Sequence, residues 1–66
     1  MTVTANGREV ALPEPRSLTR FLEDLKLPPR SVVVELNGEA VAPSEFSDRM
    51  IRSGDRIEIV RIVAGG

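Results

Sequence analysis

Apolar and polar residues alternate with a period of two near the start of the chain. Residues 1–5 and 9–12 follow this pattern, with Asn6-Gly7 between them. Strict alternation is typical of a half-buried strand, and an Asn-Gly dipeptide favours a two-residue turn. The first twelve residues therefore predict a β-hairpin.

The period changes from two to a helical one after this hairpin. Leu18, Phe21, Leu22 and Leu25 follow at spacings of three and four, directly after Ser17, which is a good N-cap residue. A proline pair then prevents the helix from continuing. The pattern predicts a helix of about two and a half turns with one apolar stripe.

The second half of the chain returns to the strand period. Residues 31–37 are rich in β-branched side chains, and Asn37-Gly38 predicts a second hairpin into a short strand at 39–41. The last strand is predicted at 56–63.

The segment between these strands, residues 42–53, has no clean period. We expect its larger apolar side chains to fill the core from a loop with helical turns; they are Phe46, Met50 and Ile51.

A hairpin, a helix, a strand, a short strand, an irregular crossover and a final strand together predict an α+β fold. A short helix buries its stripe only against another element, so we expect one main helix across one face of a mixed sheet of four to five strands. The helical connection between the second and third strands favours parallel neighbours. This is the ubiquitin-like β-grasp arrangement, in one domain over 1–66 with a flexible tail at 64–66.

Composition narrows the possible functions. The chain has 66 residues, 9 basic and 10 acidic, and contains neither cysteine nor histidine. The usual thiolate nucleophile, general base and zinc ligands are therefore missing. The even charge distribution and the lack of a long apolar run predict no nucleic-acid partner and no membrane partner. We expect a cytoplasmic domain.

The remaining polar residues do not suggest an active site. Glu23 and Asp24 are adjacent on the predicted helix and point about 100° apart, so their carboxylates do not converge. Glu45 and Asp48 lie in the irregular crossover, and a solvated surface explains both pairs better than an active site. We expect that the chain is not an enzyme and binds no metal or cofactor.

The two glycines that follow the last apolar strand are the most informative feature. Gly65 and Gly66 carry no Cβ, so this peptide fits a slot too narrow for other residues. A frayed terminus is the alternative explanation. We interpret the tail as a substrate for other proteins.

The tail and the hairpins resemble those of the ThiS sulfur carriers of thiazole biosynthesis. The end of the chain, residues 54–66, has the Gly-Asp-x-Ile turn and strand that lead to a terminal Gly-Gly in that family. Asn6-Gly7 and the 34–39 hairpin also match in order and spacing. One departure is the absence of the Val-Pro-Arg that often follows the second hairpin, which puts any partner contact of that arginine in doubt.

The resemblance implies a mechanism in which Gly66 is the modified residue. A ThiF-like adenylating enzyme would use ATP to join the Gly66 carboxylate to AMP, and a sulfur donor protein would convert the product to a thiocarboxylate. A ThiG-like thiazole synthase would then receive the sulfur. Ala64 and Gly65 complete the tail.

Partner docking is expected on the last strand and beside it. Alternation places Ile57 and Ile59 inward, which leaves an apolar pair on the face away from the helix. An exposed apolar patch next to the tail is typical of an interaction site. The predicted docking residues are Val33, Val60, Arg61 and Ile62.

Three other functions remain open from the residues alone. A carrier for molybdopterin synthesis or tRNA thiolation would use the same tail chemistry. A protein modifier would form isopeptide bonds, and a β-grasp interaction module would have an inert tail. As a small carrier that exchanges partners, the chain is expected to be a monomer.

Overall fold

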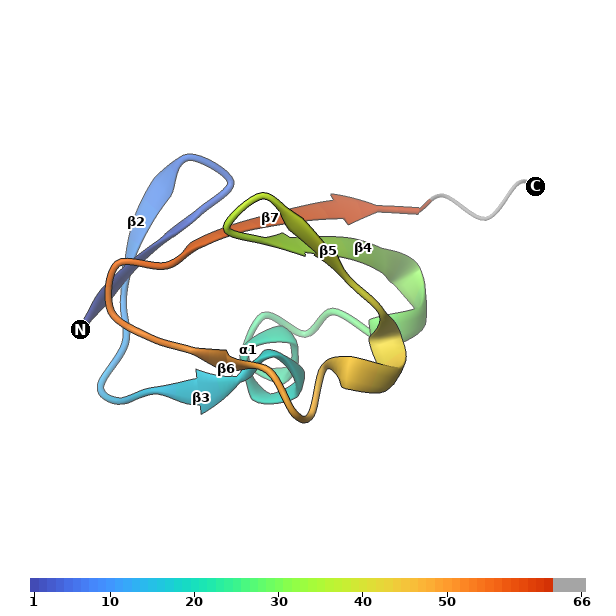
Figure 1. Cartoon of the computed structure of the whole chain (residues 1–66), viewed down its shortest axis with the longest axis horizontal. Helices are drawn as coiled ribbons and strands as arrows, with labels where there is room; N and C mark the ends of the chain where they lie inside the picture. Colours follow the sequence, from blue (N-terminus) through green and yellow to red (C-terminus); the bar gives the residue numbers. More distant parts are fainter. Residues whose placement is uncertain (63–66) are drawn as a thin grey trace.

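The computed structural model describes residues 1–62, which form a five-stranded mixed sheet with one helix across one of its faces (Figure 1). The strand order is β2-β1-β7-β4-β5. This architecture confirms the predicted α+β fold. The strands are β1 (Thr2–Ala5), β2 (Arg8–Ala11), β4 (Val32–Leu36), β5 (Glu39–Val41) and β7 (Arg56–Arg61).

The two parallel neighbours in this sheet are β1 and β7, which come first and last along the chain. β1 runs parallel to β7, whereas β1–β2, β4–β5 and β4–β7 are antiparallel. The expectation of parallel neighbours came from the helical connection between β2 and β4. Those two strands are not neighbours, because β1 and β7 lie between them. β7 is consequently the central strand of the sheet.

Both Asn-Gly dipeptides form the predicted hairpin turns. Asn6 and Gly7 have φ values of 50° and 81°, and Asn37 and Gly38 have 53° and 84°. Positive φ at both central residues is what a tight turn needs to match the twist of the flanking strands. The turns set the registers that pair β1 with β2 and β4 with β5.

The helix α1 (Leu18–Asp24) begins where the sequence predicts. The side chain of Ser17 accepts a hydrogen bond from the backbone N–H of Arg20 at 3.1 Å. Leu18, Phe21 and Leu22 are buried against the sheet. Leu25 is the C-cap and is 45% exposed, so the prediction that it belongs to the buried stripe is wrong.

A short two-stranded ribbon beside the start of α1 was not predicted from the sequence (Figure 1). β3 (Arg16–Ser17) pairs antiparallel with β6 (Met50–Ile51). Short 3-10 turns at Pro29–Ser31 and Pro43–Glu45 lead into β4 and follow β5.

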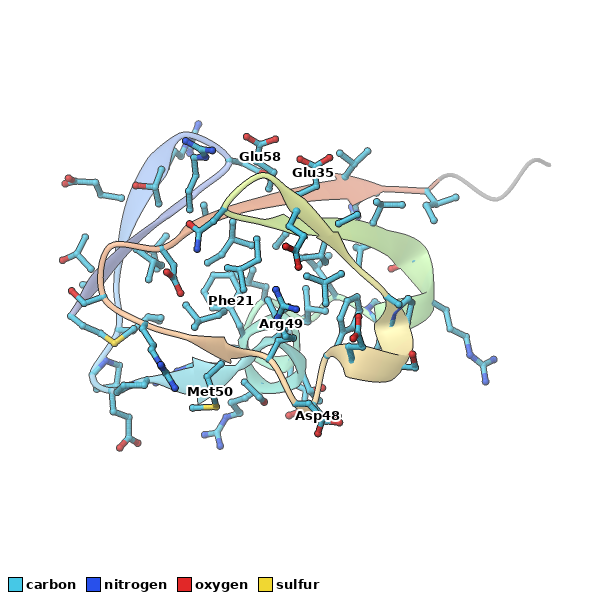
Figure 2. All side chains as sticks on the ribbon, viewed as in Figure 1. Phe21, Glu35, Asp48, Arg49, Met50 and Glu58 are labelled. Atoms are coloured by element: carbon cyan, nitrogen blue, oxygen red, sulfur yellow. The ribbon has the colours of Figure 1, made fainter. Side chains whose placement is uncertain are left out.

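The ribbon decides which side chains of the crossover enter the core. Phe46 and Ile51 are buried, as predicted. Met50 is 41% exposed, so its predicted place in the core is wrong. Successive residues of a strand point to opposite faces, and burial of Ile51 therefore turns Met50 outward (Figure 2).

The core lies between the sheet and the layer formed by α1 and the ribbon. Phe21 projects from the helix into this space (Figure 2). The buried apolar residues are Val3, Leu12, Leu18, Phe21, Leu22, Val32, Val34, Leu36, Val41, Phe46, Ile51 and Ile57. Within residues 1–62, no helix lies over the opposite face of the sheet (Figure 1).

Candidate functional site

The predicted modified residue, Gly66, and its neighbours Ala64 and Gly65 lie outside the described residues. The structure shows instead how the chain approaches this tail. β7 ends at Arg61, and the N–H of Ile62 still donates to the carbonyl oxygen of Ser31 at 2.7 Å. The chain is therefore held to β4 as far as Ile62.

An asparagine side chain extends the pairing on the other side of β7. β1 pairs with β7 only at Thr4 and Ala5. Beyond this point Oδ1 of Asn6 accepts from the N–H of Ile59 at 2.8 Å, and Nδ2 of Asn6 donates to the carbonyl of Ile59 at 3.1 Å. The side-chain amide takes the place of a peptide unit, so the last strand is bonded on both sides up to Ile59.

Three of the four predicted docking residues form an exposed apolar patch. Val33, Val60 and Ile62 are 48%, 63% and 51% exposed. Val33 lies opposite Val60 in the β4–β7 register, and Ile62 follows Val60 at the two-residue spacing that shares a face. The predicted exposure is confirmed, and a docking role stays a prediction. These three residues are called the outer patch below.

A pair of carboxylates lies beside the outer patch on the same face. Glu35 is directly opposite Glu58, two residues before Val60 on β7. Figure 2 shows both side chains pointing away from the helix. Like charges at directly opposite positions are unfavourable by roughly 0.2–1 kcal/mol. The sequence analysis missed this pair, because the register between β4 and β7 is needed to bring the two residues together.

Arg61, the fourth predicted docking residue, lies on the other face of the sheet. There it lines a hollow of about 550 Å³ between the β1–β2 hairpin, the end of α1 and β7. Alternation along β7 explains why it is separated from Val60 and Ile62. The residues around the hollow are Ala5, Asn6, Arg8, Val10, Leu25, Leu27, Ile59 and Arg61.

The carboxylates that the sequence analysis considered do not form an acid–base site. Asp24 accepts hydrogen bonds from the side chains of Arg16 and Arg20. Desolvation of the Asp24 carboxyl favours its neutral form, but the two arginines outweigh this effect and lower its pKa. Asp48 lies on the side of the molecule away from Glu35 and Glu58 (Figure 2). Within residues 1–62 no three potential metal ligands come together.

Of the helices in the described part of the chain, none has the length and apolar character needed to cross a bilayer.

Comparisons with known proteins agree on one family. The family model "ThiS family" matches residues 1–66. The sulfur carrier protein ThiS of Thermus thermophilus is 38% identical over 64 residues, which cover 97% of this chain and 98% of that protein. A thiazole synthase of Paramagnetospirillum magneticum is 32% identical over 66 residues, which are the whole of this chain and 20% of that longer protein.

A solved structure extends the agreement to three dimensions. The crystal structure of the thiamine biosynthesis protein ThiS from Geobacter metallireducens superposes with a TM-score of 0.87 at 32% identity, with complete coverage of both chains. Family members are carrier proteins, not enzymes, and bind no cofactor. The chain therefore belongs to the ThiS family, the sulfur carriers of thiamine biosynthesis.

Proposed function

We propose that this carrier holds sulfur as a thiocarboxylate on Gly66. The Gly66 carboxylate attacks the α-phosphate of ATP in a ThiF-like adenylating enzyme and displaces pyrophosphate. A sulfide equivalent from a donor protein then attacks the acyl carbon and displaces AMP. The product is a thiocarboxylate, whose sulfur is more nucleophilic than the oxygen it replaces.

The observation that carries this proposal is the family match through the terminal Gly65-Gly66. A carboxylate at the end of two residues without Cβ atoms can enter a narrow active site. Residues 64–66 span about 10 Å when extended, at 3.3–3.6 Å per residue. The folded body thus stays outside the partner while the carboxylate reaches its catalytic groups, all of which belong to the partner.

The second partner that we propose is a ThiG-like thiazole synthase. The relative from Paramagnetospirillum magneticum is named a thiazole synthase, and 20% of its length aligns with this entire chain. A carrier-like segment within a protein of that name supports physical association between carrier and synthase. Docking to these enzymes is assigned to the outer patch, where Val33, Val60 and Ile62 remain exposed beside the exit of the chain.

Carriers for molybdopterin synthesis or tRNA thiolation would use the same chemistry at the C-terminus. The comparisons favour thiamine biosynthesis over these two pathways.

In line with the family in general, we place the chain in the cytoplasm. We propose that it acts as a monomer, since one outer patch serves several partners in turn.

Intact mass spectrometry tests the proposal. The chain is incubated with ATP, an adenylating enzyme of the ThiF type and sulfide. We expect its mass to rise by the difference between one sulfur and one oxygen atom, with the change located at Gly66. A chain with one serine added after Gly66 is the matched control and should keep its mass. An equal increase in that control, or an unchanged mass with an enzyme that thiolates another carrier, contradicts the proposal.

A further inference from the structure

We propose that the hollow between the β1–β2 hairpin and the end of α1 is a second docking surface, which takes an extended partner segment rich in apolar and acidic residues. It lies on the face of the sheet opposite the outer patch. The proposal does not depend on the chemistry of the tail. It depends on the apolar floor, the unpaired charges and the backbone groups of this one region.

The floor of the hollow is apolar and partly open to solvent. Leu25, at the end of α1, is 45% exposed, and Val10, Leu27 and Ile59 are partly buried against the core. These four side chains come from β2, from β7 and from the segment that follows α1, and they surround one depression of about 550 Å³. Apolar surface that is hollowed and contiguous is typical of a binding site, unlike apolar side chains scattered singly.

Among the described residues that line the hollow, two are arginines and none carries a carboxylate. Arg8 and Arg61 line it, and within residues 1–62 neither of them forms an ion pair. Arg16, Arg20 and Arg49 are paired with carboxylates, whereas Arg30, Arg52 and Arg56 also form no ion pair among the described residues but do not line the hollow. Two unpaired guanidinium groups beside an apolar floor favour an acidic partner, because arginine binds carboxylates through charge-assisted hydrogen bonds.

The backbone hydrogen bonds of β7 also support a docking site in the hollow. The carbonyl of Ile57 accepts from the N–H of Asn6, and both backbone groups of Ile59 bond to the Asn6 side chain. Alternation gives the N–H and C=O of Arg61 this same orientation, where β1 has already ended at Ala5. An extended segment in the hollow can therefore bond to the backbone of Arg61, as in strand addition to a sheet edge.

The two faces of the sheet thus differ in charge. The outer patch adjoins Glu35 and Glu58, whereas the hollow adjoins Arg8 and Arg61. A partner that places an acidic segment in the hollow would be repelled by the outer face. The difference gives the carrier two surfaces with opposite charge preferences, one on each face of the sheet.

The test uses the full-length, 15N-labelled chain and a capped peptide, Glu-Glu-Val-Ile-Val-Glu-Glu. We expect amide shifts at Arg8, Leu27 and Arg61 that saturate with peptide and weaken with added salt. The matched peptide Lys-Lys-Val-Ile-Val-Lys-Lys keeps the apolar centre and is expected not to bind there. Arg8→Gln and Arg61→Gln should each reduce the affinity about tenfold, the loss expected for one charge-assisted hydrogen bond.

Arg30→Gln is the control variant, since Arg30 is exposed and does not line the hollow. It should bind the acidic peptide as the parent chain does. Each of three results overturns the proposal: no shifts at millimolar peptide, equal binding of the lysine peptide, or shifts confined to Val33 and Val60. Shifts of the hollow that depend on protein concentration alone would mean that a second copy occupies it, which also overturns the proposal.

Discussion

Val33 and Val60 lie directly opposite each other on β4 and β7, and both are about half exposed or more on the face that α1, the helix of the described residues, does not cover. Ile62 follows this pair on the same face, and its N–H still donates to the carbonyl oxygen of Ser31. The three apolar side chains of the outer patch thus come from β4, β7 and the residue that follows β7. Substitutions in β7 can separate docking from folding.

Replacing Val60 with threonine tests the outer patch. Threonine keeps the β-branched shape that strands favour but adds a hydroxyl to the apolar surface. We expect the affinity for the adenylating enzyme to fall about fivefold or more, as for loss of about 1 kcal/mol at an interface. The melting temperature should change little. Isothermal titration calorimetry and thermal unfolding measure the two effects.

The matched control for this substitution is Val34→Thr. Val34 follows the outer-patch residue Val33 on β4, and its side chain is completely buried. Its replacement should lower the free energy of unfolding by about 1–3 kcal/mol, because a buried hydroxyl would need a partner. Normal binding by Val60→Thr would contradict the assigned role of the outer patch.

Asn6 is expected to stabilise the end of the last strand. Asn6→Ala removes both hydrogen bonds to Ile59 and places alanine at a φ of 50°. We expect a loss of about 1–3 kcal/mol in the free energy of unfolding from urea titration. Asn6→Gly separates the two causes, since glycine accepts the positive φ but lacks the amide.

Hydrogen exchange at the Ile59 amide measures the local effect of the Asn6 substitutions. The N–H of Ile59 bonds to Asn6 Oδ1, so its exchange should accelerate in both Asn6 variants relative to Ile57. If Asn6→Gly matched the parent chain in stability and in exchange at Ile59, the asparagine would only serve the turn.

Relief of the Glu35–Glu58 repulsion should stabilise the chain. Glu58→Gln removes one of two carboxylates at directly opposite positions. We expect an increase of roughly 0.2–1 kcal/mol in the free energy of unfolding at low salt, which shrinks as salt screens the charges. Urea unfolding at two ionic strengths measures this. Glu23→Gln, on the exposed side of α1, is the control for loss of a charge alone.

Asp24 should make the stability depend on acid pH. Its pKa is lowered from the ordinary value of 3.8, because the hydrogen bonds from Arg16 and Arg20 outweigh desolvation. A carboxyl with a lowered folded pKa stabilises the fold above its ordinary pKa, and the contribution is lost as pH falls through the folded value. Asp24→Asn should therefore be less stable than the parent chain near neutrality, and the two should converge below pH 3.8. A constant difference across the acid range would mean that packing, and not charge, holds Asp24.

The strand and turn pattern could be predicted from the sequence because its causes are local. Asn-Gly adopts the two positive φ values of a tight turn, so both hairpins followed from neighbouring residues. The exposure of Val60 and Ile62 followed from the two-residue period of a strand. Gly65-Gly66 and the segment before them pointed to the ThiS family, which the family match confirms, whereas the chemistry at Gly66 stays a prediction.

Pairing between distant segments was decided only by the tertiary structure. The ribbon of β3 and β6 joins residues 16–17 to residues 50–51, and it exposes Met50 while it buries Ile51. Leu25 becomes exposed because α1 ends before it. A short sequence period does not predict this pairing or these exposures, because both depend on which distant segments pack together in the core.

The positions of like-charged side chains near one another were also decided by the pairing of distant segments. Arg8 meets Arg61 and Glu35 meets Glu58 only after β7 inserts between β1 and β4. The sequence by itself determined the faces of each strand, because a side chain's direction along a strand is a local steric property. Only the tertiary structure decided which faces adjoin, because the strand order comes from burying all apolar faces in one core.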